Sequence, residues 1–583
     1  MFQKISRKKI FLTGGVFLFF LFSMTVCFHL YMHLASASFQ KLTQTIFSKE
    51  VTSSTLTLHY TLKDPQSCGI TEIPVSYQPV TDQEDLTSQY LRQLKRIPPA
   101  SLSHSDQITY DILLLLLQQS QTSKQFSGYA EPLGATTGIQ AQLPILLGEY
   151  RFDSVRDVRT YLKLISKTDQ YFSSLLAYER QKAAHGLFMP SSCADGIIQQ
   201  CRSFSEVPLS EHLLIRIFRQ KIAAMDELSS EEKLTFMKEN QRIVQQHVLP
   251  AYQLLIHGLT DLKSSCRNEM GLYYLPDGRS YYEFLVQTST GSALSVSSIQ
   301  NRIQQQLLKD ASACRQILTQ YPEASLCSPH LFTENPSDML LDLRQKMAND
   351  FPSIPGTDYQ LKYVDSCLSP YLSPAFYLTA PVDDLDTNVI YLNPSAGYTG
   401  LDLYTTLAHE GFPGHLYQNR YSGSFLSPLR SLLGFGGYTE GWATYVEMIS
   451  YGYAARDCSK EEAAAISLAQ KHRSMLLGLS SLIDIYVHYH GFTREDVRHF
   501  LQNLGVSGTA SADAIFDAVQ ESPANYLKYY LGYLSFLDLR NWCQKNWPDQ
   551  FQITTFHQYV LEIGPCPFPV LEKYLKLCYN CSL

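Results

Sequence analysis

Apolar residues recur at spacings of three and four along much of the chain, a periodicity typical of helices with one buried face. Alternating, strand-like stretches are few and short. We therefore expect a mainly α fold with a small β-sheet. The clearest predicted helices cover 85–95, 154–184 and 209–255, and the predicted strands cover 56–62, 361–364 and 389–392.

The chain of 583 residues is longer than one compact core usually holds. Its periodic pattern is interrupted between 266 and 278, where Gly271 and Pro276-Asp277-Gly278 favour turns. We expect a soft boundary there. It separates an N-terminal helical half (38–270) from a C-terminal half (271–583), and nothing in the pattern specifies an oligomeric state.

The first 37 residues predict a signal-anchor or transmembrane segment. Basic residues precede an almost uncharged stretch from Ile10 to Leu34, which at about 1.5 Å per residue is long enough to cross a bilayer. Positive charge before the stretch predicts that this end lies in the cytoplasm and the rest of the chain outside the cell membrane. Ala35-Ser36-Ala37 resembles a cleavage site, so secretion after cleavage is the alternative. The basic residues are Lys4, Arg7, Lys8 and Lys9.

The composition indicates which kinds of partner and covalent cross-link the chain can have. A formal net charge of -7 provides no basic footprint, so we expect no nucleic-acid partner. Of the 13 cysteines, those beyond Cys27 are even in number, which is compatible with disulfides in an oxidising compartment. The candidate pairs are Cys193 with Cys201, Cys314 with Cys327, and Cys566 with Cys578 or Cys581.

The segment from His409 to His415 (His-Glu-Gly-Phe-Pro-Gly-His) offers metal ligands in an unusual spacing. Thr399-Gly-Leu-Asp402 predicts a capping box that opens the helix before it. Two histidines six apart on a straight helix point about 120° apart and could not share one ion. Pro413 and the flanking glycines, however, predict a break between them. Taken alone, a pair such as His409 and Glu410 is more often an ordinary helix pair, with His415 beginning the next helix, than a metal site.

A second acidic segment supports the metal interpretation. Glu440 follows His415 by enough residues for a return helix, and it stands among apolar neighbours, where a carboxylate is costly unless paired or metal-bound. Glu447 lies two turns further on the same face and could be a supporting residue or a surface charge. We therefore expect Zn²⁺ on His409, His415 and Glu440.

These segments, 409–418 and 440–447, resemble the bacterial domain-of-unknown-function family 885, which is grouped with zinc metallopeptidases. The resemblance covers about 60–575, and further stretches match in the expected order. It implies a large helical metallopeptidase-like fold with a deep cleft and Glu410 as general base. It also implies that His488, with Asp484 one turn before it, and Tyr529 donate hydrogen bonds in the transition state. The further stretches are 276–282, 375–378 with Asn393, 484–492 and 523–532.

The function expected from these observations is zinc-dependent peptidase activity on a peptide substrate. Glu410 would accept the proton of the attacking water. Arg473 or Arg540 are candidates to pair with a substrate carboxylate. Two alternatives share the same residues: a zinc amidase or esterase of the cell envelope, and a catalytically retired, membrane-tethered peptide-binding protein.

Two later helices also have predicted starts. A capping box is expected at Ser459–Glu462, and an N-cap is expected at Ser522, before Pro523.

Overall fold

The computed structural model describes residues 7–80, 86–329, 331–354, 356–364, 369, 372–506 and 508–581, with side chains from Phe22 to Asn580. The chain divides into two compact units. The first comprises Met1–Lys49 with Glu84–Thr122, and the second comprises Glu50–Gln83 with Ser123–Leu583. The expected boundary near 270 does not coincide with this division, because residues on both sides of it belong to the second unit.

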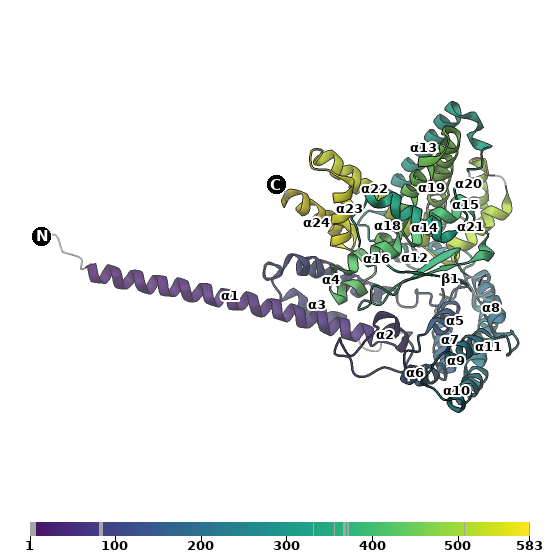
Figure 1. Cartoon of the computed structure of the whole chain (residues 1–583), viewed down its shortest axis with the longest axis horizontal. Helices are drawn as coiled ribbons and strands as arrows, with labels where there is room; N and C mark the ends of the chain where they lie inside the picture. The colour runs from purple at the N-terminus through teal and green to yellow at the C-terminus, as the bar shows by residue number, and fades with distance from the viewer. Residues whose placement is uncertain are drawn as a thin grey trace. The chain divides into compact units, whose positions relative to one another are not determined.

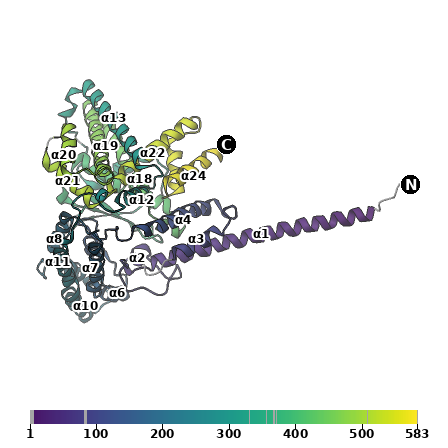
Figure 2. The same cartoon turned by 180° about the vertical axis from the view of Figure 1, so that it is seen from behind.

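The first unit is built around a long helix, α1 (Arg7–Val51), with α3 (Thr87–Lys95) and α4 (His104–Ser123) beside its C-terminal part (Figure 2). Phe39 of α1 packs on Tyr110 of α4 with ring centroids 6.4 Å apart, and Gln40 donates a hydrogen bond to Asp106 at 3.0 Å. These contacts fix α4 against α1.

The predicted anchor, Ile10 to Leu34, lies within α1, but the side chains of residues 1–21, including the predicted basic cluster, fall outside the described part. Among the described residues, no helix is both long and apolar enough to cross a membrane.

The first helices of the second unit surround a shared apolar core that includes Val158, Phe172, Ile198, Phe218 and Leu255, all buried. The predicted helix 154–184 is two helices, separated at Ser166 and Lys167. The predicted helix 209–255 is likewise divided, because Ser229 forms a capping box with Glu232 and starts a new helix. The elements are α5 (Ile139–Glu149), α6 (Val155–Ile165), α7 (Thr168–Ala184), α8 (Ser191–Ser205), α9 (Leu213–Ala223), α10 (Ser230–Ile243), a π-helical turn (Val244–Val248) and α11 (Leu249–Leu262).

The rest of the second unit is also mainly helical, which confirms the predicted fold class. Figure 1 shows the two longest of these helices, α13 and α19, side by side. The elements are α12 (Gly278–Thr290), α13 (Val296–Gln320), α14 (Pro336–Lys346), α15 (Gly400–Glu410), α16 (His415–Gly423), α17 (Pro428–Leu432), α18 (Gly436–Ala454), α19 (Lys460–Tyr489), α20 (Arg494–Asn503), α21 (Thr509–Glu521), α22 (Asn525–Asn546), α23 (Ile553–Ile563) and α24 (Phe568–Cys581).

The described residues form one small sheet, in the order β1-β3-β2. The central strand β3 (Val389–Leu392) is buried along its length and pairs in parallel with β1 (Gln360–Tyr363) and antiparallel with β2 (Ala375–Leu378). The predictions for 361–364 and 389–392 are confirmed to within one residue. The edge strand β2 was not among the predicted strands.

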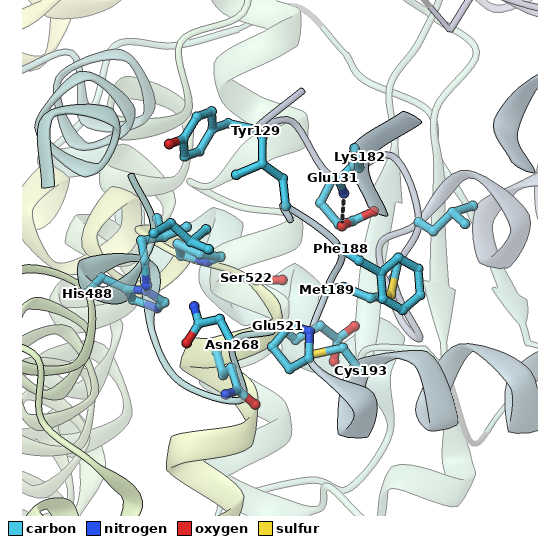
Figure 3. A pocket seen from close by; sticks show the side chains of 18 of the residues that line it. Tyr129, Glu131, Lys182, Phe188, Met189, Cys193, Asn268, His488, Glu521 and Ser522 are labelled. Carbon is cyan, nitrogen blue, oxygen red and sulfur yellow. Dashed lines mark hydrogen bonds and ion pairs between the residues drawn. The ribbon is translucent and has the colours of Figure 1, made fainter. Parts of the chain in front are cut away.

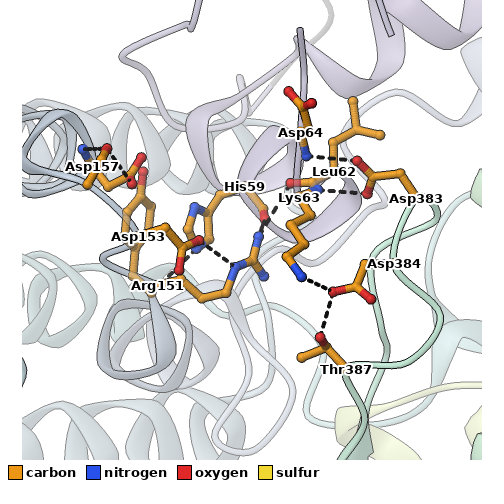
Figure 4. A network of polar contacts seen from close by, with 12 residues as sticks. His59, Leu62, Lys63, Asp64, Arg151, Asp153, Asp157, Asp383, Asp384 and Thr387 are labelled. Carbon is orange, nitrogen blue, oxygen red and sulfur yellow. Dashed lines mark hydrogen bonds and ion pairs between the residues drawn. The ribbon is translucent and has the colours of Figure 1, made fainter. Parts of the chain in front are cut away.

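The predicted strand 56–62 is wrong, since these residues form the helix α2 (Thr55–Thr61). Ser54 caps this helix by accepting a hydrogen bond from the backbone N–H of Thr57 at 3.0 Å, and a polar cap of this kind outweighs a strand-like composition. After α2 the chain is tied to the turn before β3 (Figure 4): Asp383 accepts the N–H groups of Lys63 and Asp64 at 2.7 and 2.8 Å, and Lys63 pairs with Asp384 at 2.6 Å.

Two predicted caps differ from the structure. Helix α15 does follow Thr399, but the Thr399 side chain makes no capping bond, and the N–H of Gly400 donates instead to Glu334 at 3.0 Å. Helix α22 begins at Asn525, after Ala524 rather than Ser522, because Ala524 adopts a left-handed conformation. The predicted capping box of Ser459 and Glu462 is confirmed at the start of α19.

The predicted disulfides are absent among the cysteines whose side chains the structure describes. Cys193 and Cys201 both lie on α8, where eight residues span about 12 Å, well beyond the reach of a disulfide. Cys327 packs in a small apolar cluster with Ala464 and Ala465, and this cluster does not include Cys314. The side chain of Cys581 lies outside the described residues.

Candidate metal centre

The predicted break between the two histidines is confirmed. Helix α15 ends at Glu410, the Phe412–Pro413 peptide is cis, and α16 begins at His415. Gly414 is required in this loop, because a Cβ on it would lie 1.8 Å from the carbonyl oxygen of His409. Trp442 of α18 donates from its indole Nε1 to the carbonyl of Pro413 at 3.0 Å. The loop therefore turns α16 back on α15 and is tied to the helix that carries Glu440.

This folding brings His409, His415 and Glu440 together. The Oε2 atom of Glu440 lies 3.6 Å from Nε2 of His409 and 3.4 Å from Nε2 of His415. These separations are long for hydrogen bonds. Two ligands on a tetrahedral zinc with bonds of about 2.0–2.1 Å stand about 3.3–3.5 Å apart. The residue types, and the separation of Glu440 from each histidine, thus suit a zinc ion.

A fourth residue could also reach the same ion. One ligand atom each from His409, Glu410 and His415 can be chosen within 4.8 Å of one another. The Oε2 atom of Glu410, however, accepts the N–H of Tyr377 in the edge strand β2 at 2.9 Å. This contact holds Glu410 beside β2 and suits its expected role as base, while Glu440, within 3.6 Å of both histidines, stays the expected third ligand.

A buried chain of charges orients His409. Glu447, on the same helix as Glu440, lies with Oε2 3.1 Å from Nδ1 of His409, and its Oε1 accepts from Nε of Arg473 in α19 at 2.7 Å. An acceptor at Nδ1 fixes the ring tautomer that leaves the Nε2 lone pair free for a metal. Glu447 is therefore a supporting residue, the first of the two roles open from the sequence.

The electrostatics of the site favour a cation. Burial disfavours a charged His409, but Glu440 and Glu447 outweigh it and raise the pKa of His409 to about 10. Burial likewise acts against ionised Glu440, yet the two histidines hold the pKa of Glu440 well below its usual value. Burial raises the pKa of Glu410, and the opposing effect of the nearby His415 and His409 charges only partly offsets this increase. A carboxyl with a raised pKa suits proton transfer near neutral pH.

Tyr529 reaches the same site from α22. Its ring stacks toward His409 with centroids 6.3 Å apart. This approach depends on a close crossing of α18 and α22, where a Cβ on Gly441 would lie 2.5 Å from the backbone of Gly532. Burial, with the nearby Glu440 and Glu410 charges, raises the pKa of Tyr529, so its phenol keeps its proton and can donate it in a hydrogen bond.

These side chains line a cavity of about 410 Å³. Its walls come from β2, α15, α16, α18 and the N-terminal part of α22. The cavity is lined by the four candidate metal and base residues, by Tyr529, and by Ser373, Ala375, Phe376, Tyr377, Thr379, Gln418, Asn419, Ser422, Gly423, Leu426, Ser431, Gly434, Thr439 and Pro565.

His488 does not join this site. Its Nδ1 accepts the N–H of Leu272 at 3.0 Å, and its Nε2 lies 2.9 Å from the carbonyl of Val519. Burial lowers the pKa of His488 to about 4. Both ring nitrogens are thus used by the backbone, and the ring packs structural elements together instead of facing the metal ligands.

Asp484 does not orient His488 either. It accepts the hydroxyl of Tyr282 and the N–H of Ala524, the latter at 2.9 Å, and this second bond holds the left-handed residue before α22. Burial raises the pKa of Asp484 to about 7, although both hydrogen bonds act in the opposite direction. Asp484 is therefore a buried group that fixes the start of the helix carrying Tyr529.

His488 lines a second cavity of about 250 Å³ (Figure 3). Figure 3 shows His488 on one wall and the ion pair of the buried Lys182 with Glu131 across the cavity. Lys182 also pairs with Glu179 at 3.3 Å, and burial raises the pKa of Glu179 to about 9. Lys182 is thus already held by two carboxyl groups.

Neither arginine considered for a substrate carboxylate is among the residues that line the metal cavity. Arg473 pairs with Glu447, as described above. Arg540 donates to the hydroxyl of Tyr445 at 3.4 Å and lies over its ring.

Two cavity residues were not singled out as site residues from the sequence. Tyr377 contributes the N–H that holds Glu410, and Gln418 follows His415 by one turn of α16. Both fell inside stretches that carried the family resemblance, which was the only signal for them.

Known proteins with a similar sequence or structure support the mainly helical fold. Residues 74–575 match the family model DUF885, described as a bacterial protein of unknown function, and the chain belongs to this family. No curated protein matches the chain. Among solved structures, it is similar to a candidate lipoprotein from Colwellia psychrerythraea (TM-score 0.81, 19% identity, 94% of this chain and 100% of that chain covered).

A candidate lipoprotein of unknown function from Shewanella oneidensis is also similar (TM-score 0.61, 16% identity, 86% of this chain and 94% of that chain). A candidate oligoendopeptidase F from Bacillus anthracis str. Ames matches at a TM-score of only 0.29 and 10% identity, covering 87% of this chain and 97% of that chain, which is too low to relate the folds.

Proposed function

We propose that this member of the family is a zinc-dependent peptidase. The observation that carries the proposal is the position of Glu440 Oε2, 3.6 and 3.4 Å from the Nε2 atoms of His409 and His415, at the separations that ligands of one tetrahedral zinc require. The buried support of His409 by Glu447 and Arg473 adds to it, because zinc-binding histidines are usually held in this way.

His409, His415 and Glu440 would hold the ion. When bound, zinc would supply a Lewis acid that polarises a carbonyl and lowers the pKa of a water toward about 7. Glu410, fixed by the N–H of Tyr377, would accept the proton of the attacking water and pass it to the leaving amine. Tyr529 would donate its phenol hydrogen to the carbonyl oxygen as negative charge develops there.

The proposal includes export to the cell envelope. The apolar stretch of residues 10–34 after a basic start favours a membrane anchor, with secretion as the alternative if the segment is cleaved. The description of two structurally similar proteins as candidate lipoproteins is compatible with this address.

The test is to measure the zinc content of the purified chain and then its cleavage of a mixed peptide library, with and without a chelator. The Glu410→Gln variant should keep its zinc and lose turnover by about 10²–10⁴-fold, because only the proton acceptor is removed. Glu572→Gln is the matched control, since Glu572 forms an exposed ion pair with Lys576 on α24.

Three outcomes would contradict the proposal. Near-wild-type turnover in Glu410→Gln would rule out its role as base. Absence of zinc from the wild-type chain after incubation with zinc would favour the retired peptide-binding protein. Hydrolysis of esters or acyl amides without any peptide cleavage would replace the peptidase by the amidase or esterase.

A further inference from the structure

Gln418 carries an unused hydrogen-bond donor at the candidate metal centre. The residue is 4% exposed, and its side-chain Nε2 is buried without a hydrogen-bond partner in the described part of the structure. An unsatisfied buried donor costs on the order of 1–3 kcal/mol, so such groups are rare in folded proteins. A donor left in this state next to a candidate active site calls for a ligand as its partner.

Two other polar side chains of α16 that line the cavity are paired. Asn419 donates from Nδ2 to the hydroxyl of Tyr377 at 3.1 Å. Ser422 donates from Oγ to the carbonyl of Leu561 at 2.8 Å. Both of these side chains line the same cavity as Gln418, and both fasten α16 to the surrounding elements. Gln418 thus differs from Asn419 and Ser422, because its amide Nε2 has no partner in the described part of the structure.

The position of Gln418 relates it to the ligands. It follows His415 by three residues on α16, so the two side chains lie on one face with Cβ atoms about 5–6 Å apart. A peptide advances about 3.3–3.6 Å per residue. A substrate whose scissile bond meets the ligands would thus bring the main chain of an adjacent residue to Gln418, while Tyr529 approaches from α22.

We propose that Gln418 binds the main-chain carbonyl oxygen of a substrate residue next to the scissile bond, and so positions peptide substrates in the metal cavity. An amide N–H and a peptide carbonyl are matched neutral partners. A main-chain contact of this kind recognises the peptide backbone and is indifferent to its side chains. The inference rests on the proposed peptidase function and specifies how that site recognises its substrate.

The test compares Gln418→Met with the wild type. Methionine has nearly the same shape and no donor, so Tm should stay the same or rise while kcat/KM on a cleaved library peptide falls by about 10- to 100-fold. A purely structural glutamine would lower Tm as well. Gln253→Met is the matched control, because Gln253 donates to Ser205 at 3.2 Å in the distant α11–α8 contact and should leave kcat/KM unchanged.

Two metal-directed probes separate substrate positioning from metal binding. A dipeptide hydroxamate carries main-chain carbonyls, whereas acetohydroxamate carries only the metal-binding group. Gln418→Met should weaken binding of the dipeptide probe by about tenfold and leave acetohydroxamate binding and zinc content unchanged.

Equal affinity of wild type and variant for the dipeptide probe would overturn the proposal, and so would an equal loss for both probes. Both results are distinct from failure of the peptidase proposal itself, in which the wild type binds no zinc or cleaves no peptide; that result would remove the basis for Gln418 as well.

Discussion

Replacing Glu447 by glutamine should weaken zinc binding although Glu447 is not a ligand. Its Oε2 lies 3.1 Å from Nδ1 of His409, and its Oε1 accepts from Arg473 at 2.7 Å. The substitution removes the negative charge that holds the His409 tautomer and leaves Arg473 without its partner. Loss of such a supporting residue typically costs 10- to 100-fold in metal affinity, or about 1.4–2.7 kcal/mol.

The structure indicates why the effect should be of this size. Burial acts against the Glu447 charge, yet Arg473 and His409 hold the pKa of Glu447 at about 2, so the carboxylate is ionised at any pH at which the protein would work. Both of its partners are charged or dipolar groups within hydrogen-bond distance. The amide of glutamine can accept from only one of them with its single oxygen.

The assay is competition for zinc between the purified chain and a chromophoric chelator at pH 7.5, for wild type, Glu447→Gln and the control Glu572→Gln. The control should match the wild type, because its ion pair is exposed and far from the cavity. A zinc affinity of Glu447→Gln within twofold of wild type would refute the argument that this buried chain supports the metal site.

Two further predictions concern the backbone and pH. Gly414→Ala should abolish zinc binding and lower the free energy of unfolding by at least ~3 kcal/mol in urea, because the new Cβ would lie 1.8 Å from the His409 carbonyl oxygen. Gly452→Ala is the control and should be tolerated, because its Cβ would meet open space in helix α18. Equal behaviour of the two variants would count against the loop geometry. The pKa of Asp484 is raised to about 7 in the folded state from 3.8, so the native state holds its proton more tightly, and this contribution to stability is full below about pH 4 and is lost as pH rises through 7. Urea unfolding of wild type should therefore show stability falling between pH 5 and 8 more steeply than in Asp484→Asn, whose amide oxygen can still accept from Ala524; identical slopes would remove Asp484 from the account.

Much of the candidate site could be predicted from the order of residues alone. Proline and glycine limit the backbone through local sterics, so Gly411, Pro413 and Gly414 indicated the break between His409 and His415 without any knowledge of the fold. The mainly α class followed from the period of the apolar residues. The capping box of Ser459 followed from the residue type three positions later, Glu462, which it contacts.

The wrong predictions concern residues whose hydrogen-bond partners come from distant parts of the chain. The family resemblance gave His488 a role in the transition state, with Asp484 one turn before it. In the structure Leu272, Val519, Tyr282 and Ala524, all remote in sequence, take up the polar atoms of these two residues. The predicted disulfides failed because spacing in sequence does not give spacing in space along a helix such as α8.

The sequence by itself determined which chemical groups are present and where the local backbone must bend. Only the tertiary structure decided that Glu440 meets both histidines, that Glu447 contacts both His409 and Arg473, and that Gln418 lines the cavity while its Nε2 has no partner among the described residues. These relations depend on how α15, α16, α18, α19 and α22 pack, and in particular on the close crossing at Gly441 and Gly532. Such packing is a sum of many weak contacts between residues far apart in the chain, which no local pattern records.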